Sequence, residues 1–139
     1  MKTVTLTLAL ILVSFLSNAQ EATSTNIKVA INNITSNEGK VMVSLHTADT
    51  FMKGPGIQNL EGTIENGAVS FTFENVPQGT YAIMALHDVN ENRRMDFEEN
   101  GMPKESYGLS GNAMSSGPPN FSTAKFETNG EDLEFEIRF

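Results

Sequence analysis

The sequence predicts an all-β protein, more narrowly a seven-stranded antiparallel β-sandwich with one long ordered loop. Apolar residues recur at every second position in most segments after residue 26, which is the period of a half-buried strand. Turn-forming residues separate these segments at short intervals, and no segment has the pattern of an amphipathic helix of normal length. Several short alternating strands are typical of two packed sheets of immunoglobulin-like or transthyretin-like type.

The expected strands, in order, are 27–34, 40–47, 57–66, 68–75, 80–87, 122–128 and 133–139. The first two alternate clearly and are separated by a turn at Gly39, whereas the third has weaker spacing. The fourth follows Asn66-Gly67, a dipeptide that strongly indicates a hairpin turn. The fifth, TYAIMALH, is almost continuously apolar, which is typical of a central strand covered on both faces. The last two are a short strand around Phe126 and an alternating strand after the turn NGED.

The N-terminal segment, residues 1–19, is predicted to be a signal peptide. Lys2 supplies a positive charge, the apolar stretch from Val4 to Leu16 is too short to span a bilayer, and small residues precede the expected cleavage site. We therefore expect a single mature domain of residues 20–139 that is exported, either to the periplasm or out of the cell. No membrane insertion is expected after the signal peptide is removed.

Composition restricts the classes of function. The chain has no cysteine, which excludes disulfides, thiolate zinc sites and a cysteine nucleophile. Its 9 Lys and Arg residues against 17 Asp and Glu residues give a net charge of −8. This charge argues against nucleic acid and anionic lipid as partners and favours cations, although it also serves plain solubility.

The connection from residue 88 to 120 is unusually long for a compact domain, and loops of this kind are functional or disordered. Its apolar residues predict an ordered loop. Its first part has the ligand spacing of an EF-hand, in which oxygen donors occupy positions 1, 3, 5, 7, 9 and 12. Counted from the first aspartate, these positions hold Asp88, Asn90, Asn92, Arg94 (through its backbone carbonyl), Asp96 and Glu99. The spacing predicts a calcium site of weak to moderate affinity.

Arg93 is the main departure from the EF-hand pattern. Position 6 of such loops is normally glycine because the backbone turns there with positive φ, which costs a residue with a side chain on the order of 1 kcal/mol. The preceding segment is also a strand instead of a helix. The alternative is a solvated acidic loop whose Asp and Asn side chains cap their own turns.

Four further residues are expected to anchor the loop: His87, Lys104, Glu105 and Tyr107. Lys104 and Glu105 would do so as an ion pair. A less favoured alternative is a hydrolase site that uses His87, Asp88, Glu99 and Glu105. Several methionines also fall in expected loops, where they suit a soft copper(I) ion or an apolar ligand, or simply pack the loops: Met52, Met95, Met102 and Met114.

The central motifs resemble those of a family of uncharacterised exported bacterial proteins, domain of unknown function 2141. The matching positions are Phe73, Val76-Pro77, Gly79 to Ala82, His87 to Asp96, Gly101 to Ser110 and Gly117 to Phe121. The segment VPQGTYAI is also similar to a hairpin of carboxypeptidase-regulatory-like sandwich modules. The resemblance implies a transthyretin-like sandwich and export, and it implies no reaction.

Together these observations predict an exported, non-catalytic binding or accessory module with a calcium-type loop at 88–99. The alternative is a metal-free structural or protein-interaction domain. The partners expected are another exported or cell-surface protein or a small ligand, and not nucleic acid.

Overall fold

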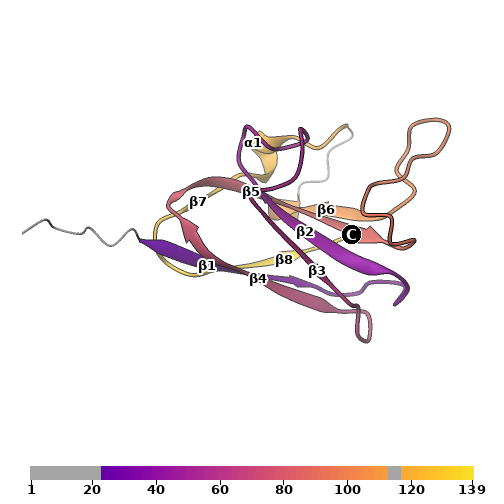
Figure 1. Ribbon diagram of the computed structural model, residues 1–139, viewed down its shortest axis with the longest axis horizontal. Helices are drawn as coiled ribbons and strands as arrows, with labels where there is room; N and C mark the ends of the chain where they lie inside the picture. The colour runs from indigo at the N-terminus through magenta and orange to yellow at the C-terminus, as the bar shows by residue number, and fades with distance from the viewer. Residues whose placement is uncertain (1–22, 113–116) are drawn as a thin grey trace, which may run out of the picture.

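Residues 23–112 and 117–139, which the computed structural model describes, contain eight strands in two sheets that pack face to face (Figure 1). The strands are β1 (Ser24–Ile31), β2 (Lys40–His46), β3 (Gln58–Gly62), β4 (Val69–Pro77), β5 (Gly79–Asp88), β6 (Tyr107–Leu109), β7 (Phe126–Thr128) and β8 (Leu133–Ile137). A 3₁₀ turn, η1 (Ser110–Asn112), and a one-turn helix, α1 (Phe121–Ala124), complete the elements. The predicted all-β sandwich is confirmed, and the predicted signal peptide lies outside the described residues.

The first sheet has the strand order β4–β1–β8, with β1 in the middle. Every second residue of β1 is buried, so that Val29, for example, lies between its neighbours Phe71 and Phe135. The pair β1–β4 is antiparallel, but β1 and β8 run parallel. The expectation of antiparallel sheets throughout is therefore wrong for this pair. Most of the chain separates β1 from β8, so no tight turn forces them to run in opposite directions.

The second sheet has the order β3–β2–β5–β6, and β7 pairs with the first residues of β5. Alternate residues of β2 and β5 point into the space between the sheets, where they meet the buried face of the first sheet. The fully buried side chains of this core are Ile27, Val29, Ile31, Val41, Val43, Leu45, Phe73, Val76, Ile83 and Ile137. Each contributes roughly 1.5–3 kcal/mol through burial.

All seven expected strands occur, with differences that have local causes. Residues 122–128 form a strand only from Phe126, because Asn120 accepts the N–H of Ser122 at 2.9 Å and starts the helical turn α1. β6 lies within the expected long loop. The turn at Asn66-Gly67 is left-handed at both residues, as such dipeptides favour, but it leads the chain from one sheet to the other.

The central strand β5 is covered on both faces, as its apolar sequence predicts. Its inner face belongs to the main core, and its outer face packs at one end under a smaller cluster of Phe51, Ala82, Leu109 and Ala124. Phe51 comes from the segment 47–57 and Ala124 from α1, so both connections fold back over the sheet (Figure 1). One end of the outer face of the second sheet is therefore covered by these two connections.

Candidate functional site

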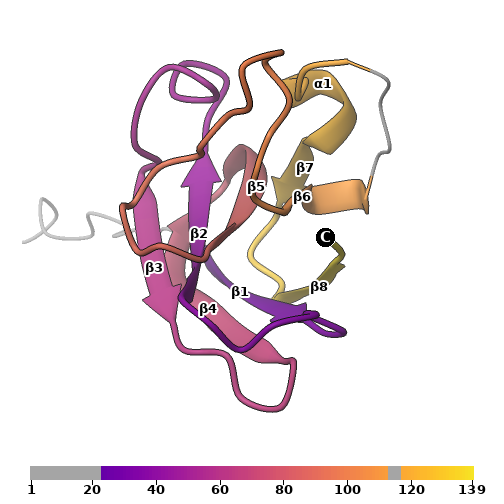
Figure 2. The same cartoon turned by 90° about the vertical axis from the view of Figure 1, so that its right-hand side faces the viewer.

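A groove of about 610 Å³ lies on the outer face of the second sheet. Its floor consists mainly of the residues of β2 and β5 that alternate with the core positions. Its walls are the segments 47–57 and 89–106, which Figure 2 shows on this side of the sheet. The lining residues are Met42, Ser44, His46, Met52, Gly54, Pro55, Asn59, Met84, Ala85, Leu86, Arg93, Met95, Phe97, Pro103, Tyr107 and Pro119. The lining is mainly apolar, and it contains no carboxylate among the described residues.

The segment 47–57 is held in place by its own hydrogen bonds. The N–H of Phe51 donates to the carbonyl of Thr47 at 3.0 Å, and the side chain of Asn59 bonds the backbone of Gly56 in both directions, at 3.0 and 2.8 Å. Phe51 packs edge-on against Phe121 at a centroid distance of 5.6 Å. These contacts fix the conformation of the segment 47–57, which forms the first wall of the groove.

His46 ends β2 and lines the groove, and its side chain is only 4 % exposed. Its Nδ1 lies 3.2 Å from the hydroxyl of Thr50, which in turn donates to the carbonyl of Thr47 at 3.4 Å. Because the hydroxyl proton is used in this way, Nδ1 of His46 is assigned as the donor. Burial lowers the pKa of His46 below its ordinary value of 6.5, and the hydrogen bond at Thr50 partly offsets this shift.

The second wall begins at Asp88, the last residue of β5, whose carboxylate organises the loop. This side chain is 1 % exposed and accepts the N–H groups of Asn92 at 3.1 Å and of Arg93 at 2.7 Å. The backbone is left-handed at Glu91 and at Arg93, with φ values of 57° and 63°. Arg93 therefore has the positive φ that position 6 of such a loop requires, without the glycine that usually supplies it.

The amide and carboxylate groups of the loop face one another. Oδ2 of Asp96 accepts from the side-chain amides of both Asn90, at 2.6 Å, and Asn92, at 2.8 Å. The oxygen of Asn90 accepts the N–H of Asn92, and the oxygen of Asn92 accepts that of Arg94. The structure thus brings together Asp88, Asn90, Asn92 and Asp96 of the predicted ligand set, joined by these hydrogen bonds.

The structure does not bring Glu99 to this group. A bridge between Phe97 and Pro103 and a turn closed by the N–H of Gly101 on the carbonyl of Glu98 place Glu99, exposed, in a small hairpin. Glu105 returns to the loop instead, and its side chain is 8 % exposed. Its two carboxylate oxygens accept the N–H groups of Val89 at 3.0 Å and of Asp96 at 3.3 Å.

Lys104 and Glu105 do not form the expected ion pair, since Lys104 joins no ion pair in the described part of the chain. Lys104 contacts the loop through its backbone, whose N–H donates to the carbonyl of Asp96 at 2.8 Å. The loop is bound to the sheet by Arg93, whose guanidinium lies 3.3 Å from the carboxylate of Glu61 in β3. Arg93 therefore reaches from the loop after β5 to β3, with β2 between them in the sheet, and lines the groove.

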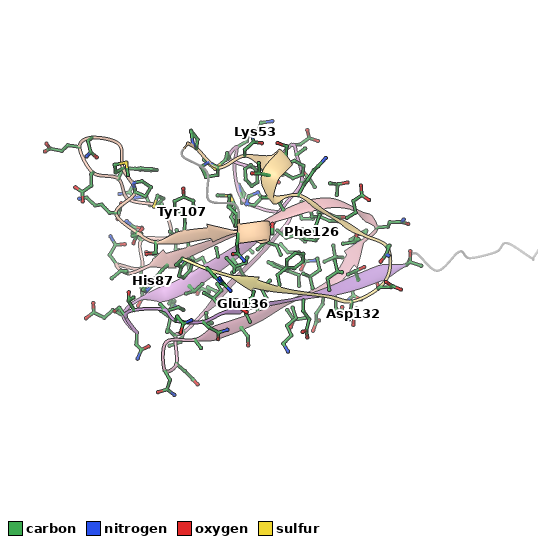
Figure 3. The ribbon with its side chains drawn as sticks, turned by 180° about the vertical axis from the view of Figure 1, so that it is seen from behind. Lys53, His87, Tyr107, Phe126, Asp132 and Glu136 are labelled. Carbon is green, nitrogen blue, oxygen red and sulfur yellow. The ribbon has the colours of Figure 1, made fainter. Side chains whose placement is uncertain are left out.

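His87 and Tyr107 have separate surroundings. His87 is buried, donates from Nε2 to the carbonyl of Glu38 at 2.8 Å, and stacks on Phe139. Tyr107 lies in β6, paired with Leu86, and lines the groove beside the segment 89–106 (Figure 3). The groups named for a hydrolase site, His87, Asp88, Glu99 and Glu105, thus have different partners. Among residues 23–112 and 117–139, no three His, Asp or Glu side chains gather closely enough to hold a metal.

The groove itself was not predicted from the sequence. Its signal is present in β2 and β5, where Met42, Met84 and Leu86 occupy the positions that an exposed sheet face would fill with polar residues. The methionines of the expected loops are placed differently by the structure: Met52 and Met95 line the groove, whereas Met102 does not. Met114 lies outside the described residues.

The fold and these features define an all-β sandwich with an apolar groove beside a polar, turn-rich loop. The model of a family described as an uncharacterized protein conserved in bacteria (DUF2141) matches residues 29–136. The chain therefore belongs to this family, as its central motifs predicted. No curated protein and no solved structure matches the chain. Within the described residues no helix is long and apolar enough to cross a membrane.

Proposed function

We propose that this chain is an exported, non-catalytic binding module that holds a small, uncharged, apolar molecule in the groove on the outer face of β2 and β5. The observation that carries the proposal is the groove itself. Its volume, about 610 Å³, falls within the 300–1,000 Å³ of small-molecule sites. Its lining combines apolar side chains with a few polar groups, chiefly Ser44, His46 and Asn59, which is the usual composition of such sites.

Several features support a non-catalytic role. The carboxylates of Asp88 and Glu105 are used to hold backbone N–H groups of the loop, and the imidazole of His87 is bonded to a carbonyl on another segment. Export is supported by the signal-peptide pattern of residues 1–19. The net charge of −8 favours an uncharged ligand over an anionic one.

The test is binding of a neutral, environment-sensitive naphthylamine dye, measured by its fluorescence. Met52 and Met102 provide a matched pair, since they are 58 % and 61 % exposed but only Met52 lines the groove. We expect Met52→Gln to weaken dye binding and Met102→Gln to leave it unchanged, because only the first makes the lining more polar. Absence of dye binding, or equal effects of the two substitutions, would contradict the proposal. Capture of a protein partner on this face, without dye binding, would favour an interaction domain instead.

A second candidate function is calcium binding at the loop after β5. It is favoured by the convergence of Asp88, Asn90, Asn92 and Asp96, whose oxygens are the ligand type that calcium prefers. Glu105, which already faces the loop, is then better placed than Glu99 to supply a closing carboxylate. A cation would gain its affinity from coordination by these oxygens, and it would have to displace the amide groups of Asn90 and Asn92 that now donate to Asp96.

The test of this second function is thermal unfolding with millimolar calcium and with a chelator. Binding to the folded state alone raises the midpoint. Asp96→Asn is expected to reduce the calcium-dependent rise, whereas Asp49→Asn, an exposed change in the segment 47–57, is not. A midpoint that calcium does not move would contradict calcium binding and leave the groove proposal intact.

A further inference from the structure

Four of the five methionines in the described part of the chain line the same groove: Met42, Met52, Met84 and Met95. Methionine is a flexible apolar residue, so such a lining suits an apolar ligand. Its thioether is also a soft ligand for metal ions. The question is therefore whether a nitrogen ligand lies among these sulfurs.

His46 provides that nitrogen. Nδ1–H of its ring donates to the hydroxyl oxygen of Thr50, and the ring packs edge-on against Phe51 at 5.8 Å between centroids. Nε2 has no hydrogen-bond partner among the residues that the structure describes, although the side chain is 4 % exposed and lines the groove. With the proton on Nδ1, Nε2 carries the lone pair that a metal requires. Orientation of the ring by a bond to the other nitrogen is typical of metal-binding histidines.

The strand register places a thioether beside this nitrogen. His46 lies opposite Ala82 and Ser44 lies opposite Met84, so Met84 is the diagonal neighbour of His46 on the same face of the sheet. Diagonal Cα atoms are roughly 7–8 Å apart, which long side chains bridge easily. Met42 is the diagonal neighbour of Met84 on its other side.

Met52 adds a sulfur from the wall. Its backbone is left-handed, with φ 58°, and its side chain lines the groove while being 58 % exposed. A methionine with positive φ is uncommon, and residues of this kind are concentrated at functional sites. The segment 47–57 thus presents Met52 to the groove that His46, the last residue of β2, also lines.

The chemistry of this set selects one kind of ion. The groove lacks carboxylates among the described residues, which makes it a poor site for calcium, magnesium or manganese. Thioethers with a neutral imidazole suit a soft monovalent ion. Arg93 is the cationic group in the lining, and its ion pair with Glu61 offsets its charge.

We propose that Nε2 of His46 and the thioethers of Met84 and Met52 bind copper(I) at one end of the groove. This proposal rests on the groove being an open binding site, as proposed above, and adds a metal to it. Met42, one position farther along the sheet, and Met95, on the opposite wall, are available to complete the ligand set.

The experiment is anaerobic titration of the protein with copper(I) in competition with a chromophoric copper(I) chelator. We expect the protein to take one copper(I) from the chelator. Met84→Leu and His46→Phe should weaken binding by at least about tenfold, because each removes a ligand while keeping side-chain bulk. Met102→Leu, outside the groove, should bind as the unchanged protein does. Failure to take copper(I) from the chelator, or equal affinity in all variants, would overturn the proposal.

Dye binding by the same variants separates this proposal from the one on which it rests. Leucine keeps the groove apolar, so Met84→Leu is expected to retain the naphthylamine dye while losing copper(I). Thermal unfolding of each variant verifies that it is folded. Dye binding without copper(I) binding would overturn the metal site alone, and loss of both in Met84→Leu would overturn the assignment of a ligand role to its sulfur.

Discussion

The backbone N–H of Arg93 donates a 2.7 Å hydrogen bond to Oδ2 of Asp88, and the Arg93 backbone is left-handed at this point, with φ 63°. This geometry costs a residue with a side chain about 1 kcal/mol, which glycine avoids. The loop therefore has a residue with a strained backbone, Arg93, at the position where glycine would relieve the strain. The guanidinium of Arg93 supplies a reason, since it reaches Glu61 on β3.

Arg93→Gly is expected to leave the protein about 1 kcal/mol more stable than Arg94→Gly does, because glycine raises the entropy of the unfolded chain in both variants but removes backbone strain only at Arg93. The lost ion pair subtracts little, since the Arg93 side chain is 70 % exposed and surface pairs contribute about 0–1 kcal/mol. Urea denaturation measures the change. Arg94→Gly, at a neighbour without positive φ, is the control and should lower stability by about 0.5–1 kcal/mol. An equal loss of stability in both variants would show that φ at Arg93 carries no strain.

Glu105→Gln is expected to lower the free energy of unfolding by about 1–3 kcal/mol. One of the two N–H groups now held by the carboxylate, on Val89 or Asp96, would face an amide NH₂ in place of an oxygen, in a nearly buried position. Glu99→Gln, on the exposed hairpin, should change stability by less than about 0.5 kcal/mol. Equal effects would mean that Glu105 does not hold the loop.

The contrast between Glu99 and Glu105 shows what the sequence could predict about the loop. Spacing from Asp88 identified the residues whose contacts are local, and positive φ at Arg93 followed from the same numbering. Glu99 was predicted as a calcium ligand because it is at position 12 counted from Asp88, which assumes that the backbone curls around the ion without interruption. The bridge between Phe97 and Pro103 diverts the chain into a hairpin, and a pairing of this kind leaves no periodic signal.

The same distinction applies to the fold. Burial on one face has a period of two, so the seven expected strands could be located, and the continuous apolar run of β5 revealed its two covered faces. Pairing depends on contacts between distant segments, so the parallel alignment of β1 with β8 was not predicted. The groove exists because the segments 47–57 and 89–106 fold back over the second sheet. The apolar residues on the outer face of β2 and β5 indicate that this face is covered, but not by which segments.

Ser110→Ala tests the link between the sheet and the smaller apolar cluster. The Ser110 hydroxyl is fully buried, accepts the N–H of Ile83 at 2.9 Å and donates to the carbonyl of Ala124 at 2.6 Å. Its removal leaves both backbone groups without this partner, and we expect a loss of about 2–3 kcal/mol in the free energy of unfolding. Ser70→Ala, at an exposed position in β4, should stay within about 0.5 kcal/mol of the unchanged protein. A small effect at Ser110 would argue that α1 is held by apolar packing alone.

His46 is expected to make the stability of the metal-free protein depend on pH. Burial lowers its pKa in the folded state, so below pH 6.5, the ordinary value, the unfolded chain takes up a proton that the folded protein still excludes. The contribution is therefore complete above pH 6.5 and is lost as the pH falls through this value toward the lower folded pKa. Arg93 and Tyr107 line the same groove, and Arg93 stays charged throughout this range.

The measurement is urea denaturation at a series of pH values between neutral and mildly acidic, with a chelator present to exclude bound metal. The difference in stability between the unchanged protein and His46→Phe should be constant above pH 6.5 and should shift against the unchanged protein below it. Subtracting the variant cancels the carboxylates common to both proteins. A difference that does not change with pH would mean that the ring of His46 gains a proton as readily in the folded groove as in the unfolded chain.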